Sequence, residues 1–203
     1  RFADRGRGGQ VLAIVSALPG EGKSTIAANL ALALKAAGER VALVDGDLRN
    51  PALTRALAPH AERGLMDVLR GALPLENVLV QDAATGLVVL PCVRTGAVVN
   101  AAELIETGHF DMVLERLRLA FDHVIVDAAP LLPVVDGRAI VDRVDGALLV
   151  VEWGRTDRAA VQEAIRTLAG NADRVTGAVL SKVATGAYQY YGVGGYGGTY
   201  GQT

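Results

Sequence analysis

The sequence predicts a doubly wound α/β domain with a mostly parallel sheet and helices on both faces. Three observations support this: short apolar runs recur along the chain, helical stretches separate them, and a glycine-rich loop follows the first run. Strands that alternate with helices form parallel sheets, because each return to the same edge needs a helix-length connection. Ligands of such sheets bind beyond the carboxyl ends of the strands, so functional residues are expected there.

The apolar runs are too short for helices and are expected as buried strands, at residues 11–17, 41–45, 87–90, 124–127, 147–151 and 175–180. The clearest helical stretches are residues 24–37, 111–120 and 157–169. A chain of 203 residues is long enough for one domain around one core. We therefore expect a folded domain over residues 1–183 and a flexible Gly/Tyr-rich tail over residues 184–203.

Composition excludes several classes of protein. A net charge of -2 gives no electrostatic reason to expect a nucleic-acid partner. Cys92 is the single cysteine, so no internal disulfide can form, and three scattered histidines suggest no zinc site. No apolar run reaches the roughly 18 residues that span a bilayer, so this chain is expected to be soluble. It begins at Arg1, and we expect a piece of a longer protein with membrane segments possible upstream.

Residues 17–25, with the sequence ALPGEGKST, match the phosphate-loop pattern GxxxxGK[ST], except that Ala17 replaces the first glycine. Gly20 and Gly22 let successive N–H groups point at phosphate oxygens, and the following helix aims its positive end at them. Lys23 supplies a charge for the β- and γ-phosphates, and the Ser24 hydroxyl can coordinate Mg²⁺. A chance glycine-rich turn is disfavoured by the strand–loop–helix order. ATP and Mg²⁺ are the expected cofactors.

Three aspartates follow predicted strands at the same edge of the sheet. Asp127 ends the run VIVD, and Asp45 and Asp47 follow the strand that comes after the phosphate-loop helix. A single aspartate in this position more often caps a turn or helix. Beside a phosphate loop, three convergent carboxylates instead indicate a site that holds a metal ion and its water shell.

All five tyrosines of the chain lie in the glycine-rich tail, at Tyr188, Tyr190, Tyr191, Tyr196 and Tyr200. Such a segment could be low-complexity material that favours association. Behind a phosphate loop and the acidic motifs, however, this low-complexity reading is disfavoured.

These motifs resemble the bacterial tyrosine kinases that control capsule and exopolysaccharide export, which are relatives of the Min and Par type ATPases. The resemblance covers nearly all of the chain. It rests on residues 19–25 as Walker A, residues 44–51 as Walker A′, residues 125–130 as Walker B, and the terminal tyrosines. Residues 64–71 and 145–151 also resemble the family, and no eukaryotic-type kinase motif is present.

The resemblance implies transfer of the ATP γ-phosphate to the tail tyrosines, with Lys23, Asp45 and Asp47 as catalytic residues. Asp45 would orient or deprotonate the tyrosine, and Lys23 would stabilise the moving charge. Mg²⁺ would be held by Ser24, Asp47 and Asp127, partly through water. Relatives carry Asn at the position of Ser181, where it contacts adenine, and a serine could still bond the base edge. The expected nucleotide-binding residues are Pro19, Gly20, Glu21, Gly22, Lys23, Ser24, Thr25 and Ser181.

The resemblance also implies partners. Family members form rings in which tails are phosphorylated in trans, and they work with a transmembrane polysaccharide co-polymerase segment or adaptor and an opposing tyrosine phosphatase. This places the protein at the cytoplasmic face of the bacterial inner membrane. The basic and aromatic ring-forming helix is absent here, since residues 1–7 would be at most its last turn. This chain is therefore expected to be monomeric or weakly associating, with no nucleic-acid partner.

Two other functions fit parts of the pattern. A Min or Par type organiser ATPase would hydrolyse ATP and use dimerisation as a switch, but it usually carries a second lysine early in the phosphate loop. Here position 18 is leucine, and no lysine precedes Lys23. A nucleotide-sensing assembly module would bind ATP without essential catalysis. For Asp136, two readings stay open, a place near the site or a helix cap, while Cys92 and Trp153 are expected to be structural.

Overall fold

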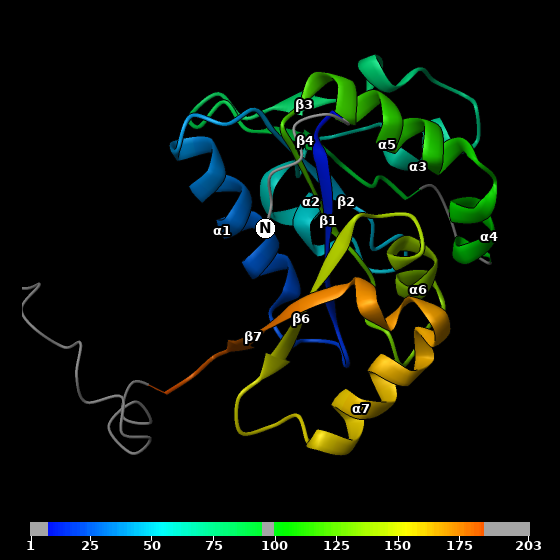
Figure 1. Cartoon of the computed structure of the whole chain (residues 1–203). Coiled ribbons are helices and arrows are strands. Elements are labelled where there is room, and N and C mark those ends of the chain that lie inside the picture. The colour runs from blue at the N-terminus through cyan, green and yellow to red at the C-terminus, as the bar shows by residue number, and fades with distance from the viewer. Residues whose placement is uncertain (1–7, 95–99, 185–203) are drawn as a thin grey trace, which may run out of the picture.

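The structure is a computed structural model that describes residues 8–94 and 100–184. Its centre is one seven-stranded sheet with the order β3-β4-β2-β5-β1-β6-β7 (Figure 1). All neighbouring strands are parallel except β3, which runs antiparallel to β4 at one edge. The strands are β1 Gln10–Ser16, β2 Val41–Asp45, β3 Val80–Gln81, β4 Val88–Leu90, β5 His123–Asp127, β6 Gly146–Glu152 and β7 Val175–Ser181. The predicted doubly wound, mostly parallel α/β fold is confirmed.

Helices fill the connections between the strands. The α-helices are α1 Lys23–Ala36, α2 Ala52–Leu57, α3 Leu65–Leu69, α4 Ala101–Glu106, α5 His109–Ala120, α6 Asp136–Val141 and α7 Arg158–Thr167. Two 3₁₀ segments, η1 Leu75–Asn77 and η2 Ala169–Arg174, complete the described elements. The strands and helices predicted from sequence end within two residues of the observed bounds. The short helices and the two-residue β3 were not predicted, because so few residues show no periodicity.

The sheet is buried on both faces, and each strand sends alternate side chains to opposite sides. In β5, Val124 and Val126 join a core with α5, whereas Ile125 joins a second core with α1. Figure 1 shows α1 on one side of the sheet and α3 to α6 on the other. Because both faces are covered, the central strands contain no polar alternation, which explains their continuous apolar runs. No helix in the described part of the chain is long and apolar enough to cross a membrane.

Close backbone packing behind the site requires a glycine at position 137. A Cβ added to Gly137 in α6 would lie 2.2 Å from the carbonyl oxygen of Ala129, two residues beyond β5. We expect Gly137→Ala to push α6 away and cost about 1–3 kcal/mol, a fall of roughly 2–4 °C in Tm per kcal/mol. Gly170→Ala is the matched control, because no atom lies within 4 Å of its added Cβ. Thermal unfolding that gives the same Tm for both variants contradicts this packing argument.

Candidate active site

The carboxyl ends of three adjacent strands bring the predicted motifs together. β2 and β5 pair in register, so that Asp45 lies directly beside Asp127. β1 pairs with the other edge of β5 and leads into the phosphate loop. Residues far apart in sequence therefore meet at one edge of the sheet, where parallel α/β folds bind ligands.

The phosphate loop has the backbone that its glycines were expected to provide. Gly20 and Gly22 have φ values of 82° and 93°, which L-residues rarely adopt. Gly22 is also the N-cap of α1, and neither a capping side chain nor an acidic first-turn residue meets the free N–H groups. Fourteen residues of α1 follow, so the loop presents an unneutralised helix N-terminus suited to phosphate. Ala17 does not have a positive φ, since Ala169 and Lys182 are the only described non-glycine residues that do. Its backbone is therefore open to any residue, which explains why alanine can replace a glycine there.

Glu21 and Ser181 support the phosphate loop from behind. The buried Glu21 carboxylate accepts hydrogen bonds from the Leu18 amide at 2.6 Å, the Glu152 amide at 3.3 Å and the Thr156 hydroxyl. The Ser181 hydroxyl donates to the Glu21 carbonyl at 2.5 Å. The Ser181 proton is thus donated to the loop, so any contact with a base edge would use the hydroxyl oxygen as an acceptor, and the predicted contact stays a prediction. The Glu21 side chain is turned away from the nucleotide cavity.

Lys23 bridges two of the three aspartates. Its Nζ lies 3.0 Å from Oδ2 of Asp47 and 3.5 Å from Oδ1 of Asp127, and the residue is only 7% exposed. Burial by itself would lower the pKa of Lys23, but Asp127 and Asp47 outweigh it and the pKa is raised. The ammonium group therefore remains charged at neutral pH.

Asp45 and Asp127 have fewer partners than buried carboxylates usually have. Oδ2 of Asp45 accepts from the Thr54 amide at 2.7 Å and the Thr54 hydroxyl at 2.6 Å, while its Oδ1 has no hydrogen-bond partner in the described structure. Neither oxygen of Asp127 has one there either. Burial raises the pKa of Asp45 to about 7, against the hydrogen bonds from Thr54, and burial also raises the pKa of Asp127. Three carboxyl groups therefore share one ammonium in a buried environment, which favours protonation of Asp45 and Asp127.

These residues fit a hydrated Mg²⁺ that arrives with a nucleotide. Three buried carboxylate oxygens have no hydrogen-bond partner, although one of them, Oδ1 of Asp127, lies 3.5 Å from the Lys23 ammonium. These oxygens and the Ser24 hydroxyl beside Lys23 are the hard oxygen donors that Mg²⁺ prefers. Within the described ranges no cluster of three or more His, Cys, Asp or Glu side chains could hold a metal by itself. Mg²⁺ commonly takes only one or two carboxylates and completes its shell with water and phosphate oxygens, which agrees with this arrangement.

A cavity of about 470 Å³ opens in front of the phosphate loop, a volume typical of small-ligand sites. It is lined by Pro19, Gly20, Gly22, Lys23, Ser24 and Thr25, by Asp47 and Arg49 after β2, and by Lys182 after β7. Lys182 was not predicted as a site residue, and its Nζ donates to the Gly20 carbonyl at 2.7 Å. Sequence reasoning placed only its neighbour Ser181 in the site, and the return of β7 to the phosphate loop brings Lys182 there as well.

Arg49 is held at this cavity by Asp136. The Asp136 carboxylate is fully buried and accepts from Arg49 Nε at 2.5 Å and Nη2 at 3.3 Å. Asp136 begins α6, but the N-cap is Val135 and no side chain caps that helix. Of the two readings of Asp136, the structure therefore favours the one near the site.

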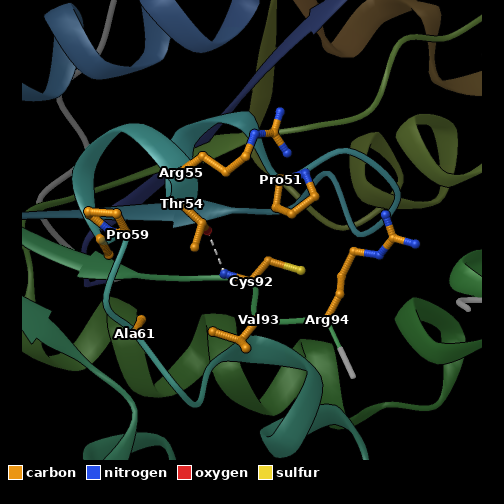
Figure 2. Close-up of a pocket in the computed structure, with 9 residues that line it drawn as sticks. Pro51, Thr54, Arg55, Pro59, Ala61, Cys92, Val93 and Arg94 are labelled. Carbon is orange, nitrogen blue, oxygen red and sulfur yellow. Dashed lines mark hydrogen bonds between the residues drawn. The ribbon is translucent and has the colours of Figure 1, made fainter. Parts of the chain in front are cut away.

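A second cavity of about 440 Å³ lies beside α2 and the segment after β4 (Figure 2). Its lining residues include Thr54, Cys92, Arg55 and Arg94. Burial raises the pKa of the Cys92 thiol to about 12, so it stays protonated, in line with the structural role expected for it. Thr54 lines this cavity and also contacts Asp45, so one residue connects the two regions.

The phosphate loop, the acidic strand ends and the doubly wound sheet define a P-loop nucleotide-binding protein. The family model AAA_31, described as an AAA domain, matches residues 9–169. The tyrosine-protein kinase CpsD of Streptococcus agalactiae is 32% identical over 193 residues, covering 95% of this chain and 83% of CpsD. The chain thus belongs to the AAA_31 family and, within it, to the bacterial tyrosine kinases represented by CpsD.

Two further comparisons agree with this membership. The succinoglycan biosynthesis transport protein ExoP of Rhizobium meliloti (strain 1021) is 40% identical over 174 residues, covering 85% of this chain but 22% of ExoP. The chain therefore spans about a fifth of that larger relative. The kinase domain of the Escherichia coli tyrosine kinase ETK superposes with a TM-score of 0.81 at 27% identity, covering 87% of this chain and 68% of that one.

Proposed function

We propose that this chain is an ATP-dependent protein-tyrosine autokinase that phosphorylates its own C-terminal tyrosines. The observation that carries the proposal is the cluster of Lys23, Asp45, Asp47 and Asp127 at a phosphate loop, in a chain whose five tyrosines all follow β7 in sequence. The proposed acceptors, which lie outside the described residues, are Tyr188, Tyr190, Tyr191, Tyr196 and Tyr200. Names such as tyrosine-protein kinase CpsD among the relatives support this proposal.

In the proposed reaction, the phenol oxygen of an acceptor tyrosine attacks the γ-phosphorus of ATP. A new P–O bond forms, the bond between the γ-phosphorus and the β–γ bridging oxygen breaks, and ADP leaves with its electron pair. The phenol proton passes to the Asp45 carboxylate and then to solvent. This acid–base role suits a carboxyl whose pKa is about 7, because such a group accepts and releases a proton near neutral pH.

The remaining residues position and neutralise charge. Lys23 rests between Asp47 and Asp127 and can share its ammonium with the β- and γ-phosphates. The free N–H groups of the phosphate loop and the start of α1 face the same phosphates. Ser24, Asp47 and Asp127 would hold Mg²⁺, which supplies charge neutralisation on the transferring group when bound. Phosphoryl transfer depends mainly on such positioning, because little covalent chemistry is left to the protein.

The cellular setting is proposed from the relatives. ExoP is named a succinoglycan biosynthesis transport protein, which supports a role for this chain in exopolysaccharide synthesis and export. We further propose that its partner is a transmembrane polysaccharide co-polymerase segment or adaptor, at the cytoplasmic face of the inner membrane. Tails are phosphorylated in trans within a ring, and a tyrosine phosphatase reverses the modification.

Intact mass spectrometry after incubation with Mg-ATP tests the proposed function. We expect the chain to gain a ladder of phosphate groups, up to one for each of the five tyrosines. A version that ends at residue 183 is the control, since it keeps the phosphate loop and all three aspartates but has no acceptor. It should bind Mg-ATP and gain no mass. If the full chain turns over ATP without gaining mass, an organiser ATPase is favoured instead. If it binds ATP but shows neither turnover nor mass gain, a nucleotide-sensing module is favoured.

A further inference from the structure

An aspartate outside the recognised motifs holds an arginine at the wall of the nucleotide cavity. We infer that Asp136 is a positioning residue that fixes Arg49, so that the free edge of its guanidinium meets the terminal phosphate of ATP. The inference rests on the proposed function and deepens it, because it assigns a cation to the transferred phosphate and names the residue that aims it. Asp136 begins α6, and Arg49 lies in the segment after β2.

Among the described residues, the Asp136 carboxylate is bonded to Arg49 alone. It is fully buried, and it accepts from Nε of that guanidinium at 2.5 Å and from Nη2 at 3.3 Å. Its role is not that of a helix cap, because Val135 is the N-cap of α6 and no side chain caps this helix. A buried carboxylate is unfavourable unless it is paired, so the ion pair with Arg49 is what stabilises the charge of Asp136 at this depth.

The geometry of this ion pair leaves the opposite edge of the guanidinium free. Arginine carries five N–H donors in a planar, rigid fork. Nε and Nη2 each donate one proton to Asp136, and the described residues accept none of the others. Because the occupied edge faces a buried carboxylate, the edge with both protons of Nη1 points the other way. The Arg49 side chain is 39% exposed and lines the nucleotide cavity, so this free edge is open to a ligand there.

The walls of the cavity indicate which part of the nucleotide Arg49 meets. The phosphate loop forms one wall, with Gly22, Lys23 and Ser24, and its N–H groups enclose the phosphates nearer the ribose. Arg49 lies on the wall formed by the segment after β2, together with Asp47, whose Oδ2 contacts the Lys23 ammonium. A cation on that wall suits the terminal phosphate, whose oxygens carry the charge of the transfer and bond well to the arginine fork.

Backbone contacts fix the segment that carries Arg49. The Asn50 amide donates to Oδ1 of Asp47 at 2.9 Å, and Nη1 of Arg94 donates to the Arg49 carbonyl at 2.5 Å. A group fixed before the substrate arrives loses little orientational entropy in the reaction, and this lowers the barrier. Without the charge of Asp136, the Arg49 side chain could turn toward solvent, and the terminal phosphate would lose a positioned cation.

A second arginine–aspartate pair provides a matched control at the opposite end of the same two strands. Arg40 precedes β2 and Asp122 precedes β5. Nε of Arg40 donates to Oδ2 of Asp122 at 3.1 Å and Nη2 donates to Oδ1 at 2.7 Å, which is the same side-on fork. This pair is exposed, and neither residue lines the nucleotide cavity. Substitutions there therefore report what loss of such a fork does to the fold alone.

The test compares Arg49→Ala, Asp136→Asn and the double variant with the control Asp122→Asn. Each full-length variant is assayed for tail phosphorylation, for Tm, and for its dissociation constants with Mg-ADP and a non-hydrolysable Mg-ATP analogue. For Arg49→Ala we expect kcat to fall about 10³-fold, the lower end of the range for an arginine that stabilises the transferring phosphate. The ATP analogue should bind about 10-fold more weakly, the loss expected for one hydrogen bond to a charged group. Mg-ADP should bind as before, because it lacks the terminal phosphate.

The variants of Asp136 test whether it acts through Arg49. For Asp136→Asn we expect kcat to fall about 10- to 100-fold, because a small misplacement of a group that contacts the substrate costs up to about 10²-fold. In the Arg49→Ala background the same exchange should lower kcat no further, since the group that Asp136 positions is already gone. A purely structural ion pair would lower Tm without changing the ratio of the two dissociation constants. Asp122→Asn should change neither this ratio nor kcat.

The possible outcomes separate this inference from the proposed function. If the wild-type chain gains no phosphate, the proposed function is overturned, and the ratio of the dissociation constants decides the inference. The inference is overturned if Arg49→Ala leaves that ratio unchanged, or if Asp136→Asn keeps both the wild-type ratio and kcat. Should Asp136→Asn fail to fold, NMR of the wild-type chain decides. Slow rotation of the Arg49 guanidinium is expected, with Nη1 signals that shift on binding the ATP analogue and not ADP, and free rotation overturns the inference.

Discussion

Replacing Lys23 by methionine is expected to abolish tail phosphorylation and also to lower the stability of the nucleotide-free protein. The Nζ of Lys23 is 3.0 Å from Asp47 and 3.5 Å from Asp127, and its ammonium is the only Lys or Arg group within 4 Å of either carboxylate in the described structure. Removing one partner of a buried ion pair leaves an uncompensated charge, at a cost of about 3–5 kcal/mol. Tm should fall by roughly 2–4 °C for each kcal/mol.

Lys35→Met is the matched control, since it makes the same exchange in the last turn of the same helix, outside the site. Differential scanning calorimetry without nucleotide and the mass ladder with Mg-ATP provide the two readouts. Phosphotyrosine that persists in Lys23→Met would show that the phosphate site is wrongly assigned. A Tm equal to that of Lys35→Met would show instead that the carboxylates do not depend on this ammonium.

Replacing Asp45 by asparagine is expected to abolish phosphorylation while stabilising the nucleotide-free fold at neutral pH. Burial raises the pKa of Asp45 from 3.8 to about 7, so the folded state binds this proton more tightly than the unfolded state does. The contribution of Asp45 to stability is therefore fully present below about pH 4 and is lost as the pH rises to about 7. The loss is on the order of 4 kcal/mol and is constant above that pH.

Asparagine cannot ionise, so the Tm of Asp45→Asn should exceed that of the wild type by a margin that widens between pH 5 and pH 7.5. Its transfer rate should fall about 10²- to 10⁴-fold, the range expected when a general base is lost. Asp82→Asn is the control: hydrogen bonds from Thr85 lower the pKa of the exposed Asp82, so its removal should not stabilise the fold. A margin that stays constant with pH would contradict the ionisation of a buried Asp45.

These two predictions have opposite effects on stability for one physical reason. The nucleotide-free site gathers Asp45, Asp47 and Asp127 around one lysine, which is unfavourable in a buried environment. Mg²⁺ and the loop donors become favourable neighbours once nucleotide binds, so ligand should stabilise the wild type by mass action. Part of the stability of the free protein is thereby given up for a site suited to phosphoryl transfer.

Local sequence determined the strands, the phosphate loop and the positions of the three aspartates. A strand that is covered on both faces is continuously apolar. A phosphate loop needs glycine at positions 20 and 22 and a helix directly after it. The strand signal and the phosphate-loop signal therefore each lie within a dozen residues of sequence. The Asp residues at strand ends followed from the same local reading. The short helices α2 and α6 were not predicted, because tertiary packing rather than periodicity stabilises them.

Only the tertiary structure decided which side chains meet. Sheet order places β2 beside β5 and so joins Asp45 to Asp127, although they are far apart in the chain. Ser181 reaches the Glu21 carbonyl across 160 positions, and Thr54 meets the Cys92 amide across 38. A hydrogen bond is specified by distance and direction in space, and residue type alone does not reveal which partner the fold will bring within 3 Å.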